Sequence, residues 1–210
     1  MDPISALALT LGVGWASGIN LYAAIATLGV LHHMELMALP AELQIVASPV
    51  VIAAAGLMYL VEFFADKIPG VDSAWDALHT FIRIPAGAVL AAQAVGDVHP
   101  ALSLAAGLVG GSLAATSHLT KAGARLAINT SPEPFSNWAA SITEDVAVIG
   151  GLWLALQHPV VFLALLVLFI ALVVWLAPKL FRFLRGLFRR IAGWFGRPPG
   201  PTVNPTAPIP

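Results

Sequence analysis

The chain has 210 residues, of which 59% are hydrophobic and only 10% are charged. A soluble domain carries about 25% charged residues, so this chain has too little polar surface to cover a fold in water. The composition predicts an all-α, polytopic membrane protein without a separate soluble module. The absence of cysteine excludes disulfides, thiolate metal sites and cysteine nucleophiles.

The N-terminal apolar run follows Asp2 and has no Lys or Arg before it, so it lacks the positive region of a cleavable signal. We expect it to be retained as the first membrane span, at about residues 4–31. Gly14 and Gly18 within it predict a close approach by a neighbouring helix. Asn20 lies near the middle of this span, where it makes either an interhelical hydrogen bond or a substrate contact, and we favour the hydrogen bond.

Five further apolar runs bring the expected number of membrane spans to about six. Their approximate ranges are residues 45–64, 75–95, 101–120, 138–156 and 160–176. The adjacent His32 and His33 before the second span point to different faces and have no matching ligands nearby, so we expect no metal there. The third span should begin at a cap formed by Asp72 or Ser73 and should be kinked at Pro85.

The C-terminal part of the chain differs from the apolar spans. Residues 179–195 mix bases with large apolar side chains, which predicts an amphipathic helix lying on an anionic membrane surface. The bases expected to bind lipid there are Lys179, Arg182, Arg185, Arg189 and Arg190. The sequence thus divides into a transmembrane domain (1–178), this basic helix (179–196) and a proline-rich tail (197–210), which should be extended or disordered.

The positions of the bases predict a topology. All ten Lys and Arg residues lie near the second–third connection, near the fourth–fifth connection or at the C-terminus. The positive-inside rule then places both termini in the cytoplasm. Residues 73–75 and 136–138 share a Ser-x-Trp pattern at the start of the third and fifth spans. The hairpin of spans two and three and the hairpin of spans four and five are therefore either parallel repeats or alike by chance.

Charged and titratable side chains recur at similar depth on four of the expected spans. The candidate site for a substrate or ion consists of Glu62, Asp76, His79, Arg83, His118, Glu144 and Asp145. An unpaired charge at the centre of a membrane helix costs about 2.5–3.5 kcal/mol, so we expect these groups to pair. We predict that Arg83 contacts Glu144 or Asp145 and that Asp76 lies with His79, whose ordinary pKa makes it the pH-sensitive member.

Two interpretations of these charges stay open. They form either an ion-pair network that fixes helix packing or a polar cavity that opens to the cytoplasm. The first fits a non-catalytic membrane scaffold or accessory subunit, and the second fits a small transporter or permeation protein for a polar or ionic solute. There is no GxSxG or HExxH pattern, so we expect no enzyme activity, metal or cofactor. The expected partners are anionic lipids and either further copies of the chain or another membrane protein, but no nucleic acid.

Three segments carry a resemblance to a known family: SGINLYA at 17–23, the stretch from VEFFADKIPG to RIPAGA at 61–88, and the stretch from KAGARLAINTSPEPF to TEDVAV at 121–148. They resemble an uncharacterised bacterial integral-membrane family catalogued as domain of unknown function 4126. The resemblance covers about residues 10–155, and the last span, basic helix and tail lie outside it. It implies a bacterial inner-membrane protein in which the last two segments are defining parts, but it implies no mechanism.

Overall fold

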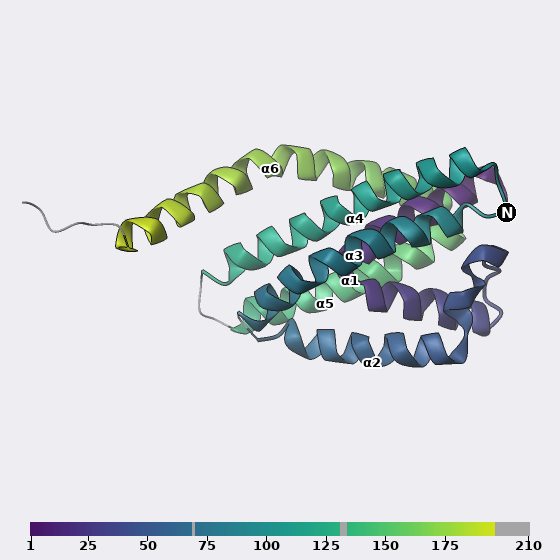
Figure 1. Cartoon of the computed structure of the whole chain (residues 1–210), viewed down its shortest axis with the longest axis horizontal. Helices are drawn as coiled ribbons and strands as arrows, with labels where there is room; N and C mark the ends of the chain where they lie inside the picture. The colour runs from purple at the N-terminus through teal and green to yellow at the C-terminus, as the bar shows by residue number, and fades with distance from the viewer. Residues whose placement is uncertain (69, 131–133, 196–210) are drawn as a thin grey trace, which may run out of the picture.

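The computed structural model describes residues 1–68, 70–130 and 134–195, and every regular element in these ranges is helical (Figure 1). The elements in chain order are α1 (Pro3–His33), the 3₁₀ helix η1 (Ala41–Ala47), α2 (Pro49–Ala65), α3 (Val71–Ala94), α4 (Pro100–Ile128), α5 (Pro134–Gln157) and α6 (Pro159–Phe195). Most of the α-helices begin at a proline, whose fixed φ suits a first helical turn and whose missing N–H is not needed there. The predicted all-α fold is confirmed.

Helix α1 is interrupted in its middle. Asn20 has the extended backbone angles φ −148° and ψ 96°, so it interrupts the helical hydrogen bonding. The Asn20 Oδ1 atom accepts a hydrogen bond of 2.9 Å from the backbone N–H of Ala23, as a helix N-cap does. Asn20 therefore separates a first arm, residues 3–19, from a second arm, residues 21–33, whose first turn it caps.

The second arm of α1 returns to the end of the bundle from which the first arm came (Figure 1). Gly12 in the first arm faces Ala155, near the end of α5, and Gly29 in the second arm faces Ile52, near the start of α2. Asn20 lies between the arms and contacts Asp145, well inside α5. At 1.5 Å per residue the arms are about 25 and 20 Å long, shorter than the hydrocarbon core of a bilayer, which is about 30 Å thick.

This hairpin changes the predicted topology. Helices α2 to α6 run along the bundle in alternating directions, whereas α1 goes in and comes back (Figure 1). As a result, the N-terminus and the end of α6 lie at opposite ends of the molecule. The prediction that both termini lie in the cytoplasm assumed that the first apolar run passes straight through, whereas α1 is broken at Asn20; the orientation of the termini in a membrane stays a prediction.

The predicted count of six spans is not confirmed. Among the described residues, four helices are long and apolar enough to cross a membrane when length and composition alone are considered: α1 with its break ignored, α4, the Phe135–Gln157 part of α5 and the Pro159–Phe183 part of α6. A fifth span arises if η1 and α2, which are bent by 60° to each other, are taken together. Helix α3 is not among them, and it carries Asp72, Asp76 and Arg83. The coarser conclusion holds: several helices are suited to a membrane.

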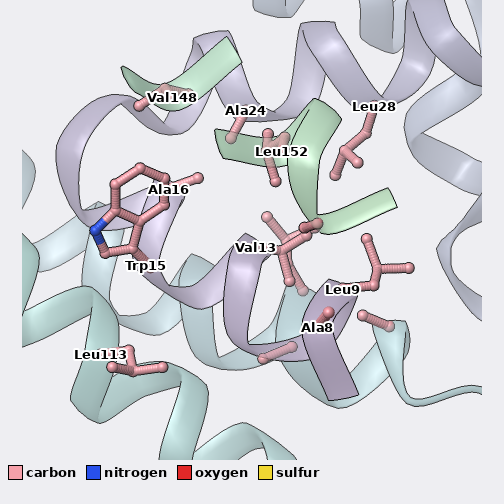
Figure 2. Packing of buried hydrophobic residues seen from close by; sticks show 14 of the residues in the cluster. Ala8, Leu9, Val13, Trp15, Ala16, Ala24, Leu28, Leu113, Val148 and Leu152 are labelled. Atoms are coloured by element: carbon pink, nitrogen blue, oxygen red, sulfur yellow. The ribbon is translucent and has the colours of Figure 1, made fainter. Parts of the chain in front are cut away.

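Small residues bring the first arm of α1 close to α4. A Cβ atom on Gly14 would lie 2.7 Å from the Cα of Gly110, and one on Gly18 would overlap the Ala114 carbonyl oxygen. The close approach predicted for these two glycines is therefore confirmed. Around this contact the core is apolar, and Figure 2 shows side chains from both arms, among them Val13 and Leu28, packed around Leu152 of α5.

The outside of the bundle is apolar as well. Phe81 on α3 is 82% exposed and Val50 on α2 is 77% exposed, and many other large apolar side chains on the long helices are more than half exposed. Soluble monomers rarely expose contiguous apolar surface on this scale. The surface is therefore suited to contact with lipid acyl chains.

The two predicted hairpins have matching directions but are not compact units. Helices α2 and α4 run toward one end of the bundle, and α3 and α5 run back from it (Figure 1). However, α3 packs mainly against α4 and α1, and it has few contacts with its sequence neighbour α2. Helix α1 touches every other long helix, so the α1 hairpin is the central element of the fold.

Helix α6 is continuous across the predicted boundary at residue 178. Pro178 lies inside it, and Leu180, just beyond this proline, still packs against Gly123 of α4. The end of α6 extends away from the bundle (Figure 1). The predicted basic segment is therefore helical, but its contact with a membrane surface stays a prediction. The proline-rich tail at 197–210 and the side chain of Arg190 lie outside the described part of the structure.

Candidate functional site

Seven charged side chains from four helical segments meet at the end of the bundle where α2 and α4 finish and α3 and α5 begin. This charge cluster consists of Glu62, Asp66, Asp76, Arg83, Lys121, Arg125 and Glu144. Six of the side chains are at most 4% exposed, and Glu144 is 18% exposed. Groups this deeply buried must be paired, because an isolated buried charge is very costly.

Arg83 binds two carboxylates. Its Nη2 donates to Glu62 Oε1 at 2.7 Å, and its Nη1 donates to Asp76 Oδ1 at 2.9 Å. The predicted partners, Glu144 or Asp145, are therefore wrong. Asp76 is two helical turns earlier on the same face of α3, and α2 brings Glu62 to the other side of the guanidinium. Both Nη atoms of Arg83 are therefore paired without α5, whereas its buried Nε has no hydrogen-bond partner among the described residues.

Lys121 is the most connected cation of the cluster. Its Nζ lies 2.7 Å from Asp66 Oδ2. The other carboxylate oxygens within 4 Å of this atom belong to Glu62 (3.4 Å), Glu144 (3.4 Å) and Asp76 (3.7 Å). Lys121 thus joins acids from three other helical segments, although it was not among the predicted site residues.

Arg125 holds Glu144 with two parallel hydrogen bonds, from Nε to Oε1 at 3.1 Å and from Nη2 to Oε2 at 2.6 Å. Its Nη1 also donates to the backbone carbonyls of Asp66 and Asn137. Arg125 was missed as well. The signal was in the sequence, because His118, Lys121 and Arg125 are spaced for one face of a helix.

The break in α1 lies against this cluster. Ile19 is the last residue of the first arm, and its carbonyl accepts a hydrogen bond of 3.2 Å from Lys121 Nζ. The Asn20 side chain donates to Asp145 Oδ1 at 3.1 Å, so the predicted interhelical hydrogen bond is confirmed. Asp145 itself makes no ion pair within the described residues. The backbone groups released at the break are thus met by polar side chains of α4 and by the Asn20 cap.

Hydrogen bonds indicate the tautomers of the two histidines of the candidate site, His79 and His118. His79 Nδ1 lies 2.9 Å from the Trp75 carbonyl, so it carries the hydrogen, and Nε2 accepts from the Tyr22 hydroxyl at 3.1 Å. His79 therefore contacts the second arm of α1 and not Asp76, contrary to the prediction.

His118 lies closer to the charges. Its Nδ1 is 3.3 Å from Arg83 Nη1, which can only donate, so Nδ1 is an acceptor. Its Nε2–H then donates to Thr80 Oγ1 at 2.7 Å, and that hydroxyl donates in turn to the Asp76 carbonyl. This chain of hydrogen bonds fixes His118 in the neutral form.

The connections at this end of the bundle are also tied together. Asn129 donates to both carboxylate oxygens of Asp72 at 2.9 Å, and Asn137 donates to Asn129 at 2.7 Å. The N-cap of α3 is Gly70, at φ 87°, so the predicted cap at Asp72 or Ser73 is wrong. Instead, the Asp72 carboxylate accepts from the backbone N–H groups of both Gly70 and Ser73.

Lys67 follows the end of α2 and turns away from the cluster. Its Nζ lies 3.0 Å from the Phe63 carbonyl and 2.9 Å from the centre of the Phe63 ring, and it donates to Ser141 at 3.3 Å. Burial lowers the pKa of this ammonium group, while the nearby carboxylates of Asp145 and Asp66 oppose that shift.

The cluster is closed and incompletely compensated. Its ion pairs join three bases to four acids, which leaves a formal charge of −1. The described residues contain no group of three or more His, Asp or Glu side chains arranged to hold a metal ion. In the conformation seen here the cluster can therefore fix helices or hold a proton, and every member except the partly exposed Glu144 would need a change in helix packing before a solute could reach it.

Comparison with known proteins adds a family but no activity. A family model described as "Domain of unknown function (DUF4126)" matches residues 7–179. The match covers most of the chain and continues through the apolar part of α6, beyond the range expected from the sequence. No curated protein and no solved structure matches the chain.

Proposed function

The chain belongs to the DUF4126 family, whose description names no activity, and we propose from its site that it binds and moves a small polar or ionic solute across a membrane. One observation carries this proposal: the break in α1 lies inside the bundle, next to the charge cluster.

A helix break within a membrane protein needs a compensating environment. Non-helical backbone at membrane depth is tolerated only where protein or water satisfies its polar groups. Here Lys121 and the Asn20 side chain provide that satisfaction. In transporters, the ends of interrupted helices form ion and substrate sites near the middle of the bilayer, because free carbonyls and N–H groups point at the ligand.

The proposed binding site extends the predicted one. It keeps the seven candidates Glu62, Asp76, His79, Arg83, His118, Glu144 and Asp145 and adds Asn20, Lys121 and the Ile19 carbonyl. Lys121 is the pivotal residue, because the same ammonium group contacts the free carbonyl of the break and the carboxylates of α2. A solute that competes for Lys121 would loosen the arms of α1 from α4.

We also propose an orientation. The positive-inside rule places the charge cluster, with its three bases, toward the cytoplasm of a bacterial cell. The arms of α1 then enter from the opposite side. The bases of the outer part of α6, including Lys179 and Arg182, reach the cytoplasmic leaflet, where each contributes about 1 kcal/mol of attraction to anionic lipid.

The test is a flux assay on the purified full-length protein in liposomes, screened with monovalent ions, protons and small anions. The diagnostic variant is Lys121→Gln, which removes the charge at the break, and the matched control is Lys179→Gln, which removes an exposed charge from the outer part of α6. We expect flux of one solute that Lys121→Gln abolishes and Lys179→Gln retains. Folded wild-type protein that passes no solute would contradict the proposal.

A second candidate is favoured by a different observation, the near-complete burial of the cluster. This second candidate function is that of a non-catalytic membrane scaffold or accessory subunit, whose ion pairs only hold the helices in place. Water access separates the two functions. Single cysteines at Glu144 and Ser117 that never react with a water-soluble thiol reagent in the folded protein would support the scaffold, whereas reactivity that depends on added solute would support transport.

A further inference from the structure

The charge cluster contains one more carboxylate than it has bases. Arg83, Lys121 and Arg125 are paired with Glu62, Asp66, Asp76 and Glu144. The nearest groups outside the cluster do not correct this difference, because Lys67, which follows α2, and Asp145 of α5 add one charge of each sign. Asp145 also has a buried oxygen, Oδ2, without a hydrogen-bond partner, but it makes no ion pair with the bases of the cluster. Asp72 of α3 is held by Asn129, His118 accepts from Arg83, and His79 faces the Tyr22 hydroxyl. Helix α1 presents Asn20 and Tyr22, but no charged side chain, to this region.

Three of the four carboxylates use only one oxygen. Glu62 Oε2, Asp66 Oδ1 and Asp76 Oδ2 are buried and have no hydrogen-bond partner, and these side chains are 0%, 4% and 1% exposed. Glu144 differs, because Arg125 occupies both of its oxygens. The uncompensated charge therefore belongs to Glu62, Asp66 and Asp76 and not to Glu144.

A buried carboxylate oxygen without a donor is costly, and an unbalanced buried charge is more so. When carboxylates share one site, the usual solution is that one of them keeps its proton. Protonation here cancels the excess charge and turns one unpaired acceptor into an O–H donor. We propose that the charge cluster holds one exchangeable proton at neutral pH, shared among the carboxyl groups of Glu62, Asp66 and Asp76.

The histidines are poor alternatives for this proton. Protonation of His118 would place an N–H opposite the Arg83 guanidinium, two donors facing each other at 3.3 Å. His79 Nε2 hydrogen-bonds to the Tyr22 hydroxyl and makes no ion pair with a carboxylate of the cluster, so a proton on it would leave the unpaired oxygens as they are. The carboxyl groups are therefore the sites where one proton binds and one negative charge disappears.

This proton deepens the proposed function, on which its role in transport rests. Loss of the proton would return the full negative charge next to Lys121 and would strengthen its attraction to Glu62 and Asp66 at the expense of the Ile19 carbonyl. Proton binding and release would thus change how firmly α4 holds the break in α1. The coupling ion of transport would then be the proton.

Infrared difference spectroscopy of the full-length protein in lipid vesicles tests the proton site directly. We expect a band of a buried protonated carboxyl at neutral pH that shifts in heavy water and is lost at alkaline pH. The single variants Glu62→Gln, Asp66→Asn and Asp76→Asn should each abolish it, because each removes the excess charge. Asp97→Asn, which changes an exposed acid of the α3–α4 connection, should retain it.

A stability measurement guards against variants that fail to fold. Each single variant, Glu62→Gln, Asp66→Asn or Asp76→Asn, should leave the midpoint of thermal unfolding nearly unchanged, because the amide resembles the protonated acid. The double variant Glu62→Gln with Asp76→Asn should lower the midpoint clearly, because it leaves Arg83 unpaired. A wild-type spectrum without this band would overturn the proton site, even if solute flux were found. A band without any flux would leave the proton site standing and contradict only its role in transport.

Discussion

The two halves of this bundle are held together in different ways. Around Leu152, the arms of α1 pack against α4, α5 and α6 through apolar and small side chains (Figure 2). Around Lys121, four helical segments and the tip of α1 are joined by ion pairs and hydrogen bonds. The apolar half gives general cohesion, whereas the polar half needs each partner in place, because a buried charge that loses its partner has no water to replace it.

The largest expected effect comes from breaking the polar half. Arg83→Ala leaves Glu62 and Asp76 buried without their main partner, and it should lower the free energy of unfolding by about 3–5 kcal/mol. Adding Glu62→Gln should restore part of this loss. Reversible unfolding in detergent micelles measures the free energy of unfolding of both variants. The control cycle combines Arg83→Ala with Glu144→Gln. If Arg83 were coupled strongly to Glu144 and not to Glu62, the pairing of Arg83 with Glu62 would be wrong.

A second substitution tests the apolar half. Gly14→Val places side-chain atoms against the backbone of Gly110 and should destabilise the protein by about 1–3 kcal/mol through overpacking. The matched control is Gly150→Val on α5, where an added Cβ meets no atom within 4 Å. We expect the control to unfold at nearly the wild-type denaturant concentration. Equal losses for the two variants would mean that α1 and α4 are not in close contact.

The break itself gives a smaller effect. Asn20→Ala removes the cap of the second arm and the donor to Asp145, and the cap alone should account for about 1 kcal/mol. Asn20→Ser keeps an acceptor for the Ala23 N–H but does not reach Asp145, so it should lose less. The same unfolding assay compares the two. If Ser is as harmful as Ala, the cap contributes little and the contact with Asp145 accounts for the loss.

The smallest effect concerns the start of α1. The hydroxyl and backbone N–H of Ser5 donate to the Asp2 carboxylate and hold its pKa below the ordinary value of 3.8. Because the folded pKa is the lower one, this stabilisation is present above pH 3.8 and is lost as the pH falls through the folded value. Asp2→Asn should therefore flatten the acid limb of the stability profile slightly. An unchanged limb would show that this cap does not contribute.

The sequence predicted the helical elements well, because long apolar runs and prolines mark them. It predicted that charges would meet at one end, since they lie at matching depths on several helices. It did not predict the turn at Asn20, because asparagine within an apolar run is compatible with a continuous helix. Nothing in the local spacing distinguishes a single crossing from two arms.

The pairing inside the cluster was predictable only in part. The face shared by Lys121 and Arg125 was visible, but which acids they reach depends on the rotation of α4 and α5, which spacing within one helix does not determine. Arg83 was assigned to α5 because Glu144 and Asp145 had matching depth, whereas the fold supplies Glu62 from α2 first. Depth restricts the partners of a buried charge, and helix rotation selects among them.

Helix α1 enters and leaves the bundle at the same end, and this path can be tested directly in a membrane. The chain has no native cysteine, so single cysteines at Asp2, His33 and Thr130 can be labelled with a membrane-impermeant maleimide in sealed vesicles of known orientation. We predict that Asp2→Cys and His33→Cys react from the same side, and that Thr130→Cys reacts only from the other. Reaction of Asp2→Cys and His33→Cys from opposite sides would show that α1 crosses the membrane once and would contradict this account.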